Sequence, residues 1–370
     1  MTVANAIRSL HRYVALATGL LMIVVGLTGS AIVFYDELAA WLYPELQSVE
    51  PAQKPLPLER LLTIAKHRAG SLPITDIELP LTASEPVIFY AETGHDEFVR
   101  LFIDPYDGAI LGQKSPREDV LGVLLLLHTH LLAGETGETI VGASGLILLF
   151  LVVTGVWMWW PGCKRVLRSF RVRLRPSLRF WSELHKVFGI VTAPTLVLVS
   201  ITGSALIFYT VAQAFLLYIT ASPPRATSPA IVAPTTSARR VSLDRLLAAA
   251  EQAIPAGTST FIHTPEQSLA PVAVRKRLPQ ETHRNGRTFV YLNPYNAQVV
   301  HIDHALRASA GVRALNLLYP LHTGDVGGLW LRVSYVLTGV LPAVLLISGI
   351  IIWWRRRTPR KVPMARMTPP

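Results

Sequence analysis

Four stretches of this 370-residue sequence are apolar for about 20 residues or more, the length of helix that crosses the hydrocarbon core of a membrane. Arg332 interrupts the fourth near its start. The first follows two arginines, as a signal peptide would, but its apolar core is too long for one and Asp36-Glu37 follow it. We interpret it as a retained anchor. The sequence therefore predicts an α-helical membrane protein with four transmembrane helices, at 13–35, 140–160, 187–209 and 329–354.

The composition agrees with a membrane protein that also has parts outside the membrane. Hydrophobic residues make up 51% of the chain and charged residues only 16%, against about 25% in an ordinary soluble domain. The single cysteine, Cys163, excludes a disulfide within one copy of the chain. It also excludes a zinc or iron–sulfur site built on several cysteines of one copy.

The net charge of +11 comes from three short segments that flank the apolar runs. Fifteen of the 35 basic residues, and no acidic residue, lie in 1–12, 161–182 and 355–370, which leaves 20 basic against 24 acidic residues elsewhere. Because basic flanks stay in the cytoplasm, we expect both termini and the middle loop to be cytoplasmic. The basic excess is then a topology signal, and we expect no nucleic acid partner.

The two long connections, roughly 44–125 and 220–325, should lie on the opposite side and look folded. Residues 57–70 and 241–253 each have the pattern of an amphipathic helix, the second with Ser242 as its N-cap. Strand-like stretches follow at 85–90, 98–103 and 288–292, and turns at 104–108 and 293–296. Each connection is predicted to be a small α+β module, and 221–240, rich in Pro, Ser, Ala and Thr, a linker.

The predicted organisation has eight parts. They are transmembrane helix 1 (1–43), module 1 (44–125), helix 2 with a preceding histidine-bearing segment (126–161), a basic loop (162–182), helix 3 (183–219), linker and module 2 (220–320), helix 4 with its preceding histidine-bearing segment (321–356) and a tail (357–370).

The sequence contains an internal repeat. Residues 10–35 match 184–209 at a constant offset of 174, and Leu127-His128-Thr129 and Trp159-Trp160 match Leu321-His322-Thr323 and Trp353-Trp354 at an offset of 194. The chain therefore reads as two copies of one unit of helix, external module and helix. Since each copy would start and end in the cytoplasm, we expect two parallel repeats about an axis along the membrane normal.

Four of the eleven histidines fall on equivalent positions of this repeat: His11 and His185 at the cytoplasmic start of a span, and His128 and His322 near the external start of one. Each could be an ordinary interfacial residue. Two pairs brought together by a two-fold axis favour a ligand role, because an ionisable residue at membrane depth is a functional candidate. His130 is a second choice beside His128, since Gly324 occupies the equivalent position.

Small residues follow both cytoplasmic-side histidines on one helix face: Ala15, Thr18, Gly26 and Gly29 after His11, and Gly189, Thr192, Ser200 and Gly203 after His185. They predict either close helix packing or a flat slot beside a ligand. Zinc or copper would need three or four clustered ligands, whereas haem iron needs two axial ones. We expect two haem groups, one near each face, with Arg332 as a candidate partner for a haem propionate.

The motifs resemble a known family. Leu-His-Arg at 10–12, Leu-Thr-Gly-Ser-Ala-Ile-Val-Phe-Tyr at 27–35, Leu-His-Thr-His-Leu-Leu-Ala-Gly-Glu at 127–135, Thr-Gly-Val-Trp-Met-Trp-Trp-Pro at 154–161 and Phe-Trp-Ser-Glu-Leu-His-Lys at 180–186 are similar to the PepSY-associated transmembrane helix family of bacterial inner-membrane proteins. The likeness within it is to ferric-siderophore reductases of the ferrioxamine type. It implies PepSY-like periplasmic modules, b-type haem and reduction of iron on the periplasmic side. It also implies haem-ligand roles for His11, His185, His128 and His322, while Gly324 and Pro342 in the second copy suggest an asymmetric external site.

The leading hypothesis is thus an oxidoreductase of the inner membrane that passes electrons through two haem b groups to a ferric siderophore. No nucleotide-binding glycine motif is present, so the electron donor must be separate, either quinol or a cytoplasmic reductase. Two alternatives stay open. One is a transporter of siderophore or iron, and the other is a non-catalytic sensor or regulatory membrane protein whose external modules bind partners.

Overall fold

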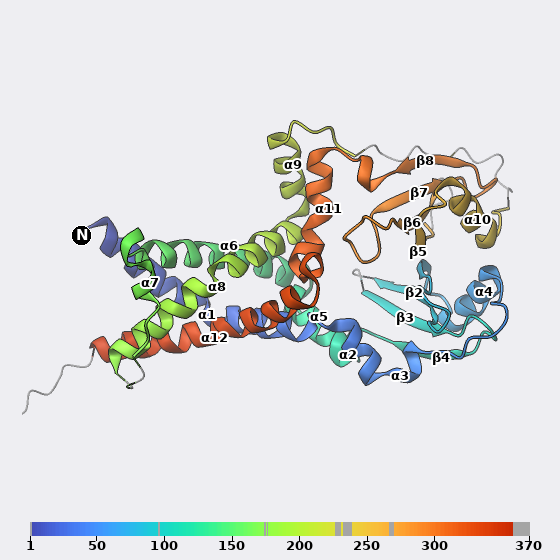
Figure 1. Ribbon diagram of the computed structural model, residues 1–370. Helices are drawn as coiled ribbons and strands as arrows, with labels where there is room; N and C mark the ends of the chain where they lie inside the picture. Colours follow the sequence, from blue (N-terminus) through green and yellow to red (C-terminus); the bar gives the residue numbers. More distant parts are fainter. Residues whose placement is uncertain are drawn as a thin grey trace, which may run out of the picture.

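The computed structural model describes residues 2–94, 97–173, 175, 177–225, 231, 239–265 and 270–357. Most of the predicted linker, 221–240, and nearly all of the tail, 357–370, lie outside these residues. A bundle of long helices forms one half of the molecule and a β-sheet with its covering helices the other half (Figure 1). The N-terminus lies at the end of the bundle that is far from the sheet.

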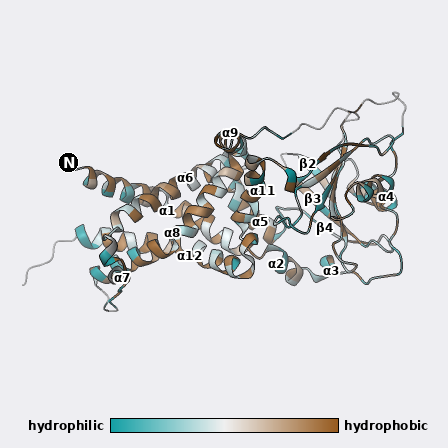
Figure 2. Ribbon diagram, turned by 45° about the horizontal axis from the view of Figure 1, so that its top comes forward, coloured by the Kyte–Doolittle hydropathy of each residue, from teal (hydrophilic) through white to brown (hydrophobic). Residues whose placement is uncertain are grey.

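In the described part of the chain, four helices are long and apolar enough to cross a membrane, which confirms the predicted number of spans. Each begins before its predicted apolar run. The start of α8 has a cap, where the Ser177 side chain accepts a hydrogen bond from the Phe180 backbone N–H. Apolar residues cover the bundle (Figure 2). Leu20, Val191 and Leu337 are more than half exposed, as expected of a surface that faces lipid. The four spans are α1 (Val3–Ile32), α6 (Gly134–Trp159), α8 (Leu178–Ile207) and α12 (Gly328–Arg357).

The four spans form a ring in which α1 and α8 occupy opposite corners. Both of these helices pack against α6 and against α12. Two matched hydrogen bonds tie neighbouring spans together. Ser30 Oγ donates to the Val336 carbonyl at 2.9 Å, and Ser204 Oγ donates to the Gly142 carbonyl at 2.8 Å. Such polar contacts hold helices together where lipid supplies no hydrophobic drive.

The two histidine-bearing segments are separate helices, α5 (Val120–His130) and α11 (Ala310–Thr323), at the sheet end of the bundle. Asp119 caps α5 by accepting from the Gly122 N–H at 3.1 Å. The chain then reverses into α6 through Leu131 and Leu132, whose φ angles of 50° and 59° are uncommon for residues other than glycine. After α11 the reversal uses Gly324, at φ 85°. His128 and His322, near the ends of these two helices, both lie among residues of the four spans.

Other short helices and turns connect these elements. They are α2 (Tyr35–Leu42), α3 (Pro44–Gln47), α7 (Val166–Ser169) and α9 (Tyr209–Ile219), with 3-10 turns at Cys163–Arg165, Ala305–Arg307 and Asp325–Gly327.

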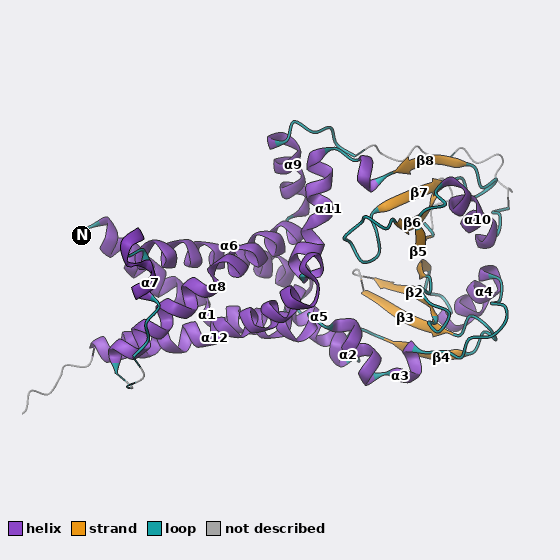
Figure 3. Ribbon diagram, viewed as in Figure 1, coloured by secondary structure: helices purple, strands orange, loops and turns teal. Residues whose placement is uncertain are grey.

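In the described part of the chain, both predicted modules contribute to one eight-stranded antiparallel sheet, in the order β4-β3-β2-β1-β5-β6-β7-β8 (Figure 3). The modules join where β1 pairs with β5, with Ile77 opposite Ile262. Without this pairing both strands would expose an edge. The strands are β1 (Ile74–Glu78), β2 (Val87–Gly94), β3 (Glu97–Ile103), β4 (Ile110–Lys114), β5 (Thr258–His263), β6 (Val272–Arg277), β7 (Thr288–Leu292) and β8 (Val299–Asp303).

The predicted amphipathic helices are confirmed as α4 (Leu58–Ala69) and α10 (Leu243–Ala253), and both cover the same face of the sheet. Leu61 and Leu246 bury their side chains there against Phe89 and Val290. The Ser242 cap is also confirmed, because its side chain accepts from the Arg245 N–H. The opposite face of the sheet looks toward the bundle (Figure 1).

Candidate functional site

His128 and His322 face one another at the sheet end of the bundle; we call them the sheet-side pair. Their ring centres lie 6.1 Å apart, and the ring planes differ by 35°. A metal atom bound by one nitrogen of each ring would lie about 2 Å from both nitrogens, and each nitrogen lies about 1 Å from its ring centre. The two ring centres would then be about 6 Å apart. The observed separation therefore suits a single metal atom between the two rings.

Hydrogen bonding fixes which nitrogen of the sheet-side pair can act as a ligand. His128 Nδ1 lies 2.9 Å from the Val25 carbonyl, which can only accept, so Nδ1 carries the proton. His322 Nδ1 lies 3.1 Å from Thr202 Oγ1, and that hydroxyl already donates to the Leu198 carbonyl at 2.7 Å. It therefore accepts from His322. In both rings the lone pair is left on Nε2, as in metal-bound histidines whose other nitrogen is held by a neighbour.

His11 and His185, the far-side pair, lie on α1 and α8, which occupy opposite corners of the bundle. His11 Nδ1 lies 2.8 Å from Thr154 Oγ1, and His185 Nδ1 lies 2.9 Å from Ser348 Oγ. Each hydroxyl donates to a carbonyl of its own helix and so accepts from the histidine. Thr154 and Ser348 are 194 residues apart, the offset seen in the sequence, and the far-side pair also keeps its lone pairs on Nε2.

Each of the four rings lies against a glycine of a neighbouring helix. A Cβ built on Gly29 would lie 2.7 Å from His128 Cε1, and one on Gly203 2.8 Å from His322 Cε1. At the far side, a Cβ on Gly155 would lie 3.5 Å from His11 Cε1, and one on Gly349 3.7 Å from His185 Cε1. Glycine is therefore required beside the sheet-side pair, where any side chain would overlap the ring.

A cavity of about 540 Å³ contains the sheet-side pair, a size typical of small-molecule and cofactor sites. Its apolar walls come from the four spans, with Met22, Leu148, Leu196 and Pro342 among them. Small residues also line the cavity and leave space between the helices. They are Gly26, Gly29, Gly145, Ser200, Gly203 and Gly339.

The small residues noted in the sequence thus divide between the two interpretations. Gly26 serves close helix packing, because its Cα faces the Gly339 carbonyl of α12. Gly29 and Gly203 make room for the rings of the sheet-side pair. These two glycines contact His128 and His322, and not His11 and His185, because α5 and α11 pack against α1 and α8.

The two pairs lie at different depths of the bundle. From His11 to Gly29, which contacts His128, α1 runs 18 residues, or about 27 Å at 1.5 Å per residue. One bound group could not reach both pairs. His130, the second candidate, is not among the described residues that line the cavity, and its Nδ1 bonds instead to the Thr129 hydroxyl at 2.7 Å.

Two arginines stand at the mouth of the cavity. Arg332 bonds both carboxylate oxygens of Glu37, at 2.6 and 2.8 Å, and also the Val33 carbonyl. Arg284, from the loop between β6 and β7, forms an ion pair with Asp36. The sequence singled out Arg332 but not Arg284, because nothing in a loop some 250 residues from α1 indicates that it reaches this cavity.

The same loop places His283 on Tyr319, with ring centres 5.1 Å apart. Burial, with added repulsion from Arg275, lowers the pKa of His283 to about 3. His283 is therefore neutral at physiological pH, so in this loop the charge facing the cavity is carried by Arg284.

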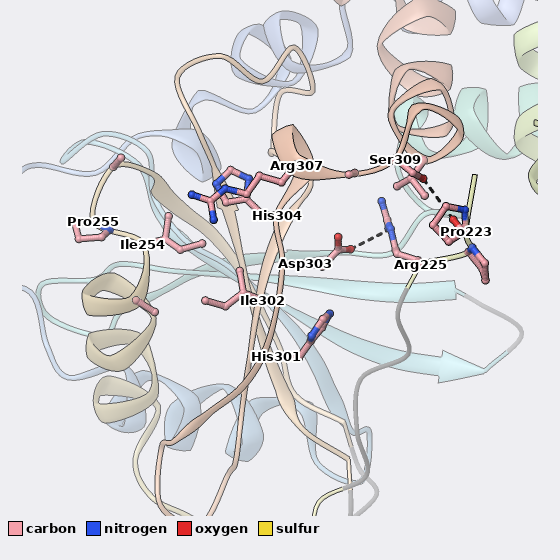
Figure 4. Close-up of a pocket in the computed structure, with 15 residues that line it drawn as sticks. Pro223, Arg225, Ile254, Pro255, His301, Ile302, Asp303, His304, Arg307 and Ser309 are labelled. Carbon is pink, nitrogen blue, oxygen red and sulfur yellow. Dashed lines mark hydrogen bonds and ion pairs between the residues drawn. The ribbon is translucent and has the colours of Figure 1, made fainter. Parts of the chain in front are cut away.

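A second cavity, also about 540 Å³, lies beside the edge strand β8 (Figure 4). Its buried acid is already paired, because Arg225 Nε contacts Asp303 at 3.0 Å while Arg225 Nη2 donates to Asn316. Within the described residues, no group of three or more His, Cys, Asp or Glu is placed to hold a metal ion. The paired histidines are the strongest candidates for a cofactor site.

Comparison with known proteins agrees with this architecture. A family model described as PepSY-associated TM region matches residues 8–356, and so covers all four spans and both modules. No curated protein matches the chain.

Proposed function

The chain belongs to the PepSY-associated TM region family, and from that premise we propose that it is a di-haem oxidoreductase that passes electrons across the bacterial inner membrane to a ferric siderophore. The observation that carries the proposal is the geometry of the histidines. Two pairs, at two depths, each have Nδ1 tied to an acceptor and Nε2 left to bind.

We further propose that the chain is built from two parallel repeats with cytoplasmic termini and periplasmic modules. Three observations support this: the constant sequence offsets, the matched bonds Ser30–Val336 and Ser204–Gly142, and a sheet order with β1 and β5 at its centre. The basic flanks give the orientation.

In this proposal His128 and His322 would hold one haem b and His11 and His185 the other. Bound haem supplies one-electron chemistry at an iron with two protein ligands. The Nδ1 partners orient each ring and keep it from rotating. Gly29 and Gly203 leave room for the sheet-side rings beside α1 and α8.

Arg332 and Arg284 would hold the propionates of the sheet-side group. Each now bonds a carboxylate that is about half exposed, Glu37 or Asp36. Because exposed ion pairs contribute about 0–1 kcal/mol, a propionate could replace Asp36 at little cost. Replacing Glu37 would cost more, since it makes two bonds to the largely buried Arg332.

The substrate would bind on the sheet side. Hard oxygen ligands of a siderophore hold Fe(II) less firmly than Fe(III), so gain of one electron weakens the chelate and releases iron. The electron would come from a separate donor, a membrane quinol or a cytoplasmic reductase.

A visible spectrum of the protein, purified in detergent after haem-replete expression, tests the proposal. We expect two haem groups per chain. His128→Ala or His322→Ala should remove one, His11→Ala or His185→Ala the other, and His130→Ala neither. The reduced protein should then transfer iron from ferric siderophores to a ferrous-iron chelator. A colourless protein would overturn the proposal and favour the sensor, and failure with every chelate would point to another acceptor.

A further inference from the structure

Two indole N–H groups at the far end of the bundle are buried and have no acceptor among the described residues. Among the described residues, Nε1 of Trp159 and Nε1 of Trp353 are inaccessible and make no hydrogen bond. They lie at the ends of α6 and α12, 194 residues apart. A buried donor without a partner destabilises the fold, and here the same defect occurs at two matched positions.

Each indole lies one helical turn from the glycine that contacts a far-side histidine. Trp159 is four residues after Gly155, which faces His11, and Trp353 is four residues after Gly349, which faces His185. Residues four apart share a helix face. Helical side chains also lean toward the N-terminus of their helix, so both indoles lean back toward the level of the far-side pair.

Anchoring at the membrane surface does not explain these two residues. An interfacial tryptophan donates its N–H to water or lipid headgroups, which requires an accessible nitrogen. The next residue of each pair fits that role, since Trp160 is 58% and Trp354 66% exposed. In each Trp-Trp motif the second side chain is exposed, whereas the indole nitrogen of the first is buried.

We propose that the indole N–H groups of Trp159 and Trp353 donate to the carboxylates of the group held by His11 and His185. This inference rests on the proposed function, in which that group is haem b, with two propionates on one edge. Two donors would then meet two acceptors. At the far side the indoles would donate beside the Arg357 guanidinium, which lies 4.4 Å from the centre of the Trp353 ring, whereas Arg332 and Arg284 serve the sheet-side group.

Trp159→Phe, Trp353→Phe and the double variant test the proposal, because phenylalanine keeps a ring and removes the N–H. Trp157→Phe on α6 and Trp354→Phe on α12 are matched controls, since both side chains are more than half exposed. All variants are also made in a His128→Ala background, where the far-side haem is the one that remains. The measurements are the rate of haem transfer to excess apomyoglobin and the midpoint potential in a reductive titration.

We expect Trp159→Phe and Trp353→Phe each to speed far-side haem release by about tenfold or more, the effect of losing a hydrogen bond to a charged acceptor. The midpoint potential should fall, because unshielded carboxylates stabilise the oxidised iron. The controls should match the parent chain. Retention of the sheet-side haem, when His128 is intact, shows that a variant is folded.

Equal release rates and potentials in Trp159→Phe, Trp353→Phe and the controls would overturn the inference and leave the proposed function standing. Absence of haem from the unaltered protein would overturn both.

Discussion

The four histidines could be found from the sequence because the repeat places them at equivalent positions, but their surroundings could not. Which glycine meets which ring depends on how α5 and α11 fold back. The reversal after α5 depends on two unusual backbone angles, at Leu131 and Leu132. No residue pattern predicts left-handed leucines. Thr154 and Ser348 could likewise not be predicted as hydrogen-bond partners of the far-side pair, since a threonine or serine within an apolar span usually bonds only its own helix.

The tight contact between glycine and ring predicts a different outcome at the two levels of the bundle. Gly29→Ala or Gly203→Ala would place a methyl group within 3 Å of the sheet-side ring, so the ring must move and lose its bond to the Val25 carbonyl or to Thr202. We expect these variants to contain about half the haem of the parent protein, measured by pyridine haemochrome absorbance.

Gly155→Ala and Gly349→Ala are the matched comparison, because a methyl group there would make ordinary contacts of 3.5 and 3.7 Å. They should keep full haem content. All four changes replace glycine within a helix, which stabilises the helix itself by about 0.5–1 kcal/mol. If Gly29→Ala or Gly203→Ala loses haem without a fall in melting temperature, the loss is therefore due to displacement of the histidine ring. Equal haem in all four variants would contradict the prediction.

At the scale of elements, the predictions made from local sequence patterns were correct, whereas the pairing of distant strands was not predicted. The helices α4 and α10, the Ser242 cap and strand β7 follow from periodicity and turn residues close to them in sequence. The single eight-stranded sheet depends on β1 meeting β5, strands about 180 residues apart. Each module alone looks complete in sequence, so nothing indicated that its first strand is paired with the other module.

A reciprocal cap between α4 and α10 strengthens this junction of the modules. The Asp244 carboxylate accepts from the backbone N–H groups of Leu58 and Glu59, at 2.8 and 3.2 Å, while Glu59 accepts from the Leu243 N–H at 3.0 Å. Each helix thus supplies the acid that caps the other. An acid at a helix N-terminus also interacts favourably with the helix dipole.

Loss of this cap should weaken α4 without disturbing the bundle. We expect Asp244→Ala to cost about 1 kcal/mol, the usual effect of removing an N-cap side chain. Hydrogen exchange of the α4 amides in the full chain measures the effect, and Asp244→Asn should restore part of the protection. Unchanged exchange in Asp244→Ala would show that the cap contributes nothing to the junction.

At the scale of the whole molecule, the bundle has two chemically different ends. The N-terminus and the end of α12 lie away from the sheet, while both long connections meet in the sheet at the other end (Figure 1). The described parts of the three basic segments counted in the sequence are therefore separated from the sheet by the length of the spans. This separation gives the proposed electron transfer its direction, from the far-side pair to the sheet-side pair.

Cysteine labelling in cells tests that direction independently of any cofactor. In a Cys163→Ser background, Lys66→Cys lies on exposed α4 and Lys164→Cys on the exposed loop after α6. A membrane-impermeant maleimide should label Lys66→Cys once the outer membrane is opened, and Lys164→Cys only after lysis, because basic flanks are retained in the cytoplasm. The reverse pattern would put the sheet in the cytoplasm, where the sheet-side pair could not serve an external ferric chelate. Labelling of both before lysis would mean that one of the four apolar helices does not span the membrane.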